Sequence, residues 1–97
     1  MKEPTIQTQH PETGKTNKII SLEKYELIKS AILGILANNT LSHTELMEAL
    51  HARVHSYFTG NAHWYGETVK LDLEARRLIQ RSKGKPPIYS LVAGGKM

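Results

Sequence analysis

Three stretches of the chain place apolar residues at helical spacing, and two shorter stretches near the C-terminus have the pattern of strands. Apolar positions three and four residues apart predict a first helix over residues 22–37, because such positions share one face of a 3.6-residue repeat. Ser21 precedes this stretch as a good N-cap, and Asn38 follows as a residue that tolerates the left-handed helix end. The apolar face of this helix consists of Tyr25, Ile28, Ile32 and Ile35.

Two further helices are expected before residue 78. Ser42 and Glu45 have the spacing of a capping box, which predicts that a second helix begins there and ends between His55 and Phe58. A third helix is expected to begin between Asn61 and Gly66 and to end near residue 77. Its apolar rows are Val69 with Leu73, and Leu71 with Ala75 and Leu78.

The C-terminal stretch reads as a β-hairpin. Residues 79–82 can be extended, residues 83–87 read Lys-Gly-Lys-Pro-Pro as a loop, and residues 88–92 alternate in polarity. Three helices followed by a hairpin predict an α+β fold.

The two ends of the chain are expected to lie outside this fold. Residues 1–18 are rich in Gln, Thr and Pro and have almost no apolar residue, so we predict a flexible N-terminal arm. Residues 19–93 are then the folded domain, and residues 94–97 form a loose C-terminus.

Composition excludes several classes of protein. The 97 residues suffice for one small domain, and the absence of cysteine excludes disulfide scaffolds, thiol catalysis and thiolate metal sites. No apolar run is long enough to span a bilayer, and the polar N-terminus lacks the apolar core of a secretory signal, so a cytoplasmic location is expected. The net charge is +4, and residues 70–97 hold seven of the thirteen Lys and Arg but two of the nine Asp and Glu. This basic C-terminal third favours a polyanion or an acidic surface as the partner.

The end of the third helix and the hairpin resemble a known family. Leu73-Glu74-Ala75-Arg76-Arg77-Leu78-Ile79-Gln80-Arg81, a basic loop with a glycine, and Ile88-Tyr89-Ser90-Leu91 are similar to the third helix and wing of many prokaryotic transcription regulators. Leu41 and Ser42 resemble the short segment before that family's second helix. The resemblance implies a three-helix winged helix-turn-helix with a C-terminal β-hairpin wing.

In that family the third helix enters the major groove of DNA and the wing lies against the backbone. The resemblance therefore implies double-stranded DNA as the partner, transcription regulation as the role, and compatibility with a homodimer that reads paired half-sites. Carried over by position, the DNA-binding residues are exposed ones near the third helix and cations of the wing: His63, Tyr65, Glu67, Thr68, Lys70, Arg81, Lys83, Gly84 and Lys85. Among the acids of the third helix, Asp72 and Glu74 are expected to form a solvated face.

Two features depart from the family pattern. Arg77 stands where the family usually has glycine before the Leu-Ile pair, so the turn from helix to strand must be made differently. The connection over residues 55–63 is also longer than the usual turn between the second and third helices.

Two other classes of function remain open. Aromatic residues around the long connection, including Tyr57, Phe58 and Trp64, suit either interface anchors of a protein-interaction or dimerisation module or a filled core. His51 and His55 have a spacing that suits zinc, with Glu48 one turn before them, but surface histidines on an amphipathic helix explain the pair equally well. No nucleophile with a neighbouring base is recognisable, so we expect neither an enzyme nor a metal or cofactor site.

Overall fold

The computed structural model describes residues 4–92, which form three helices and two small antiparallel sheets. The described elements follow the chain in this order: β1 (Thr5–Gln9), β2 (Thr16–Ser21), α1 (Leu22–Leu36), β3 (Leu41–Ser42), α2 (His43–Val54), α3 (Ala62–Ala75), β4 (Ile79–Arg81) and β5 (Ile88–Leu91). The α+β class predicted from the sequence is therefore confirmed. The expected loose C-terminus at residues 94–97 lies outside the described residues.

The three helices enclose the core at the faces that the apolar spacing predicts. Ile28 and Ile32 of α1, Leu50 of α2, and Val69 and Leu73 of α3 are completely buried. Burial of these side chains is the main stabilising contribution to such a small domain, at roughly 1.5–3 kcal/mol for each.

Helix α3 lies close against α2 because Gly66 has no side chain. A Cβ atom added there would lie 2.5 Å from Leu50 Cδ2 and 2.9 Å from Met47 Sδ. The glycine therefore allows α2 and α3 to pack at short range. This close packing determines which sides of α3 remain available to other elements.

The predicted helix starts are confirmed in detail. Ser21 Oγ accepts a hydrogen bond from the Lys24 amide at the start of α1. At the start of α2, Ser42 Oγ accepts from the Glu45 amide while Glu45 Oε1 accepts from the Ser42 amide, which is the complete capping box. These local hydrogen bonds need no distant partner, so the sequence pattern suffices to predict them.

The C-terminal hairpin, which we define as residues 79–91, is also present as predicted. Strand β5 pairs with β4 on one side and with β3 on the other, which gives the sheet order β3-β5-β4. Tyr89 is paired with both Arg81 and Leu41 and is buried. The short strand before α2 is thus tied to the hairpin that follows α3.

The turn between α3 and β4 corrects one expectation. Arg77 itself adopts a left-handed conformation, with φ of 64°. The helix therefore ends in the backbone conformation that glycine adopts most readily. Arg77 adopts this conformation although its Cβ atom makes it sterically unfavourable. The expectation that this turn is made differently is wrong.

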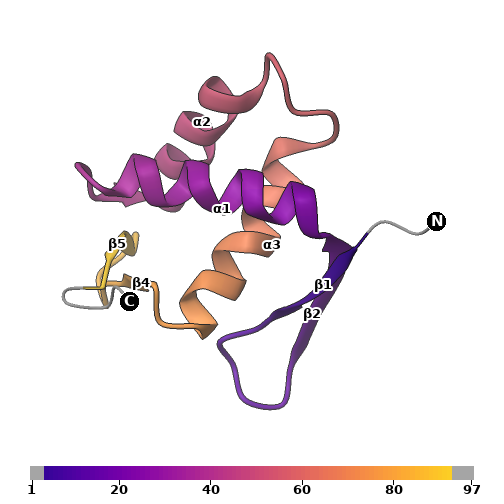
Figure 1. The fold of residues 1–97 in the computed structure, drawn as a ribbon. Coiled ribbons are helices and arrows are strands. Elements are labelled where there is room, and N and C mark those ends of the chain that lie inside the picture. The colour runs from indigo at the N-terminus through magenta and orange to yellow at the C-terminus, as the bar shows by residue number, and fades with distance from the viewer. Residues whose placement is uncertain (1–3, 93–97) are drawn as a thin grey trace.

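The N-terminal segment corrects a second expectation. Instead of a flexible arm over residues 1–18, residues 5–21 form an antiparallel hairpin, which we call the N-terminal hairpin. The expected boundary between residues 18 and 19 falls inside β2. Figure 1 shows this hairpin beside α3, on the side away from β4 and β5.

The physical reason for this difference is long-range packing. Ile20 is buried in the core, Ile6 packs against it, and Thr8 is fully enclosed with its hydroxyl donating to the Lys18 carbonyl. The segment has few apolar residues, which is why its composition predicts a flexible arm. Its polar residues, however, form hydrogen bonds with α3, and these depend on the tertiary structure.

Candidate nucleic-acid interface

The candidate interface is centred on α3 and the two hairpins on its flanks. Each hairpin is held to α3 by one buried charged side chain. Asp72 faces the N-terminal hairpin, and Lys70 faces the C-terminal hairpin.

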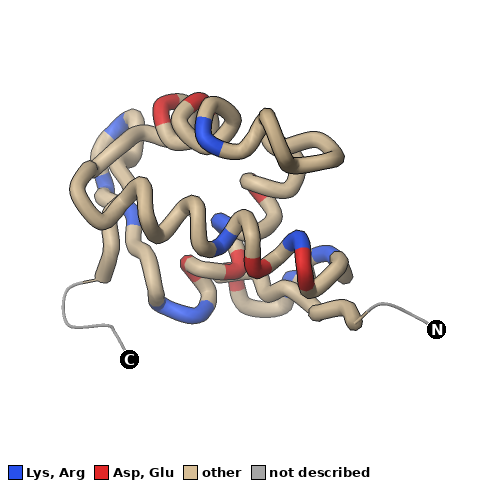
Figure 2. The backbone as a smooth tube through the Cα atoms, turned by 45° about the horizontal axis from the view of Figure 1, so that its top comes forward, with Lys and Arg blue, Asp and Glu red and all other residues tan. Residues whose placement is uncertain are grey.

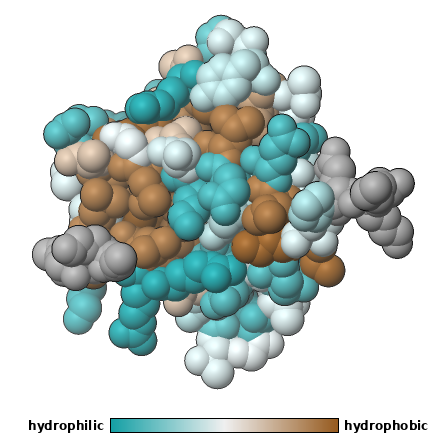
Figure 3. Space-filling view, in the orientation of Figure 1, coloured by the Kyte–Doolittle hydropathy of each residue, from teal (hydrophilic) through white to brown (hydrophobic). Residues whose placement is uncertain are grey.

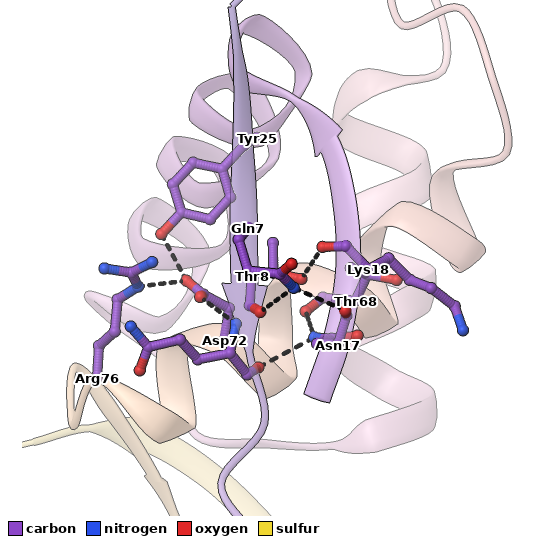
Figure 4. A network of polar contacts seen from close by, with 9 residues as sticks. Gln7, Thr8, Asn17, Lys18, Tyr25, Thr68, Asp72 and Arg76 are labelled. Atoms are coloured by element: carbon purple, nitrogen blue, oxygen red, sulfur yellow. Dashed lines mark hydrogen bonds and ion pairs between the residues drawn. The ribbon is translucent and has the colours of Figure 1, made fainter. Parts of the chain in front are cut away.

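Asp72 is the most deeply buried charge among the described residues, with an exposed fraction of 0%. Its Oδ2 accepts hydrogen bonds from the Tyr25 hydroxyl at 2.5 Å and from Arg76 Nε at 2.8 Å, and its Oδ1 accepts from the Gln9 amide at 2.8 Å. Figure 4 shows Tyr25 on α1 and Arg76 at the end of α3 directed at Asp72, and Gln9 belongs to β1 of the N-terminal hairpin. We call these four residues the Asp72 network.

The Asp72 network favours the protonated forms of two of its donors. Burial, followed by the hydrogen bond to Asp72, raises the pKa of the Tyr25 hydroxyl. The hydrogen bond to Asp72 also raises the pKa of Arg76. A carboxylate with three donors meets the requirement that a buried charge be paired. This network therefore joins α1, α3 and the hairpin, and its first role is structural.

A second contact holds the N-terminal hairpin one turn earlier on α3. Asn17 Nδ2 donates to the Thr68 carbonyl at 2.9 Å and to the Gln9 carbonyl at 3.0 Å. The hairpin is thus fixed to α3 by polar contacts from both of its strands (Figure 4).

Lys70 forms the corresponding anchor for the C-terminal hairpin. Its ammonium group donates to the Tyr89 hydroxyl at 3.0 Å and to Glu74 Oε2 at 3.1 Å. The Lys70 and Glu74 side chains are exposed by only 5% and 9%, so this ion pair is shielded from water. Arg81 Nε lies 3.8 Å from the other Glu74 oxygen. We call these four residues the Lys70 cluster.

These positions correct several expectations about α3. Thr68 and Lys70 are buried, and Tyr65 is half-buried against Phe58 and Trp64, whereas His63 and Glu67 are exposed. The predicted exposure of Thr68 and Lys70 is therefore wrong. Asp72 and Glu74 do not form a solvated face, because both lie in ion pairs against a hairpin.

The C-terminal hairpin presents its cations to solvent as expected. Arg81, Lys83 and Lys85 are exposed, as is Gly84 in the connecting loop. Residues 79–92 contain no acidic residue, and Figure 2 marks the Lys and Arg positions of residues 4–92 in blue. A hairpin that carries three cations and no acid suits contact with phosphate groups.

The histidines and aromatic residues near α2 also have defined places. The His51 and His55 rings stack at 5.4 Å between centroids, and His63 of α3 lies edge-on to His51 at 5.8 Å. Within residues 4–92, no three or more His, Asp or Glu side chains form a group that could hold a metal ion. Phe58 is buried and fills the core, but Trp64 is 43% exposed and Tyr57 is 54% exposed, so a filled core does not account for these two residues.

Comparison with known proteins places the chain in a family. Residues 5–89 match a family of unknown function, DUF6958. The chain belongs to this family. No curated protein and no solved structure gave a significant match.

The extent of the family match bears on the two hairpins. It begins at the first residue of β1 and ends within β5. The N-terminal hairpin therefore lies wholly in the part of the chain that the family shares, and the C-terminal hairpin lies in it up to Tyr89. None of the helices in residues 4–92 is long and apolar enough to cross a membrane.

Sequence reasoning missed the Asp72 network, although one signal was present. Lys70 with Glu74 and Asp72 with Arg76 are both spaced four residues apart, which places each pair on one flank of a helix. This spacing predicts the two ion pairs, but it does not predict that a hairpin packs against each of them.

Proposed function

We propose that this protein binds double-stranded DNA as a winged-helix domain, with the C-terminal hairpin against the phosphate backbone. One observation carries the proposal: the cationic hairpin that follows α3 pairs with the short strand before α2 in the order β3-β5-β4. This arrangement supports the resemblance, which implies a short segment before the second helix and a hairpin after the third. Transcription regulation, a cytoplasmic location and a homodimer on paired half-sites belong to the same proposal.

The charges support contact through the hairpin more than through the middle of α3. Lys70 is occupied by Glu74 and Tyr89, whereas Arg81, Lys83 and Lys85 of the hairpin are exposed. On the exposed surface of α3, His63 and Glu67 near its N-terminus are the polar side chains that can reach base edges. Glu67 could accept a hydrogen bond from the N4 amino group of cytosine.

The test is a titration of a fluorescently labelled mixed-sequence duplex at two salt concentrations. The double variant Lys83→Ala/Lys85→Ala should weaken binding and reduce the slope of log K against log salt by about 2, because each lost phosphate contact removes about 0.9. The matched control is Lys24→Ala/Lys29→Ala on α1, which removes the same net charge. The absence of binding by the wild-type protein at low salt would overturn the proposal, as would equal effects of the two double variants.

The exposed aromatic residues favour a second candidate function, a protein-interaction or dimerisation module without DNA binding. Tyr57 and Trp64 present large apolar surfaces to solvent, and such residues are enriched at interface centres. Figure 3 also shows apolar residues gathered over α1 on the face in view. Sedimentation of the wild type and of Trp64→Ala tests this candidate. A dimer that the substitution dissociates, without any DNA binding, would favour the second candidate over the first.

A further inference from the structure

The N-terminal hairpin packs on the far side of α3 from β4, but its turn and Arg81 of β4 border the same hollow on the surface of α3. A hollow of about 320 Å³ separates the two hairpins. Its lining includes His10, Glu12 and Lys15 from the turn, Leu71 and Glu74 from α3, and Arg81 from β4.

A second hollow of about 340 Å³ continues toward the end of α3. It shares Pro11 and Glu74 with the first and reaches Arg77 and Gln80. The two hollows together form one furrow, bordered by the N-terminal hairpin on one side and by β4 on the other. Two hairpins and one helix that are distant in sequence thus contribute to a single surface.

The furrow exposes more positive than negative charge. Arg77 is exposed, the Arg81 side chain is 59% exposed, and the Lys15 side chain is 61% exposed. Glu12 is the one well-exposed acid among the residues that line the two hollows, since the Glu74 carboxylate is held by Lys70. A surface with this balance suits an anionic partner.

The Glu12–Lys15 pair can open to admit such a partner. The two side chains lie 2.7 Å apart, and hydrogen bonding to Lys15 lowers the pKa of the Glu12 carboxyl. Both groups are well exposed, and exposed ion pairs contribute little to stability because water screens them. A phosphate group can therefore replace Glu12 as the partner of Lys15.

The turn is also held in place before any ligand arrives. The Gln9 amide donates to buried Asp72, and Asn17 donates to the Thr68 carbonyl, on the two sides of the turn. A positioned binding element loses less conformational entropy on binding than a flexible one does.

We propose that the turn of the N-terminal hairpin, residues 10–15, binds the phosphate backbone of duplex DNA through Lys15, opposite Arg81. The N-terminal hairpin is then a second wing, and α3 lies between two elements that contact the backbone. This inference rests on the proposed DNA-binding function. It adds a contact element that the family resemblance does not contain.

The test uses two substitutions in one ion pair that change charge in opposite directions. Lys15→Gln should weaken binding to a mixed-sequence duplex about fivefold and reduce the salt slope by about 1, because one phosphate contact is lost. Glu12→Gln should tighten binding, because it removes the acid that competes with phosphate. A purely structural role of the pair predicts instead that both substitutions act in the same direction.

The controls are Lys29→Gln and Glu26→Gln on α1, which make the same changes in net charge away from the furrow. Larger and opposite effects at Lys15 and Glu12 than at the controls would support the inference. Effects equal to those of the controls would overturn it, while a loss of binding in Lys83→Ala/Lys85→Ala would leave the proposed function intact. A wild-type protein that binds no duplex at low salt would overturn both proposals.

Discussion

The N-terminal and C-terminal hairpins are both held to α3 by a buried charged side chain, but the two charges have opposite signs. Each is a small antiparallel element docked on one flank of α3, and each contacts a buried charged residue of that helix that is paired with a residue four positions later. On the N-terminal side, the Asp72 carboxylate accepts from three donors. On the C-terminal side, the Lys70 ammonium donates to two acceptors.

The helix geometry explains why one short segment can serve both hairpins. Successive residues of an α-helix are turned by about 100°, so Lys70 and Asp72 point in directions about 200° apart. Their partners Glu74 and Arg76 follow one turn later on the same two flanks. The four residues therefore form two separate anchors. A substitution in one anchor should destabilise the contact of one hairpin with α3 and leave the other contact in place.

The largest effect is expected for Asp72→Ala, which breaks the anchor of the N-terminal hairpin. The Tyr25 hydroxyl, the Gln9 amide and Arg76 would all lose their acceptor. The Arg76 side chain is 33% exposed and can be hydrated, but each of the two other donors left unpaired costs about 1–3 kcal/mol, so we expect a loss of about 3–5 kcal/mol. Urea unfolding measures this loss, and amide hydrogen exchange at Gln9 shows whether the hairpin detaches. Asp72→Asn, which retains an acceptor for the Gln9 amide, should lose less, and equal losses for both variants would contradict the assignment.

A smaller effect is expected for Lys70→Met at the anchor of the C-terminal hairpin. Methionine has a similar length and apolar stem, but it leaves the buried Glu74 carboxylate with Arg81, 3.8 Å away, as its remaining partner. The free energy of unfolding should therefore fall by about 1–3 kcal/mol. Urea unfolding beside Asp72→Ala makes the comparison direct. A loss as large as that of Asp72→Ala would show that the two anchors are equally sensitive to removal of their central charge.

The junction between α3 and the C-terminal hairpin should gain stability from Arg77→Gly. A left-handed conformation costs a residue with a side chain roughly 1–2 kcal/mol, and the greater entropy of glycine in the unfolded chain offsets part of the relief. We expect a net gain of up to about 1 kcal/mol in thermal or urea unfolding. Arg77→Ala keeps the Cβ atom and removes the charge. A gain in stability for that variant would show that the charged side chain, and not the backbone conformation, is the cause.

The smallest expected effect is a pH dependence near the Lys70 cluster. Burial, with the nearby charge of Lys70 as a second cause, lowers the pKa of His43 below 6.5. The unfolded chain therefore binds the proton at a higher pH than the folded protein does, and stability should decrease as the pH falls below 6.5. Unfolding at pH 7.5 and 5.5 measures this decrease, which His43→Gln should reduce. An unchanged pH dependence in His43→Gln would rule out His43 as the source.

The candidate site was predictable to different degrees on the two sides of α3. The cations of the C-terminal hairpin are close in sequence and lie in a loop with strong turn signals, so their exposure follows from local pattern. Lys15 gives no such signal, because its importance depends on Arg81, which is 66 residues away in the chain. The same reason explains why the predicted exposure of Thr68 and Lys70 is wrong. Helical spacing shows which side of α3 a residue lies on, but not whether another element covers that side.

The sequence by itself determined the three helices, their caps, the buried apolar faces and the C-terminal hairpin. All of these depend on residues within about one or two helical turns of each other, so periodicity and capping chemistry are sufficient. Only the tertiary structure decided that residues 5–21 form a second hairpin, that Asp72 is enclosed and that Trp64 is exposed. These outcomes depend on contacts between distant segments, where Tyr25, Gln9 and Asp72 satisfy one another and offset the entropy of ordering a polar segment.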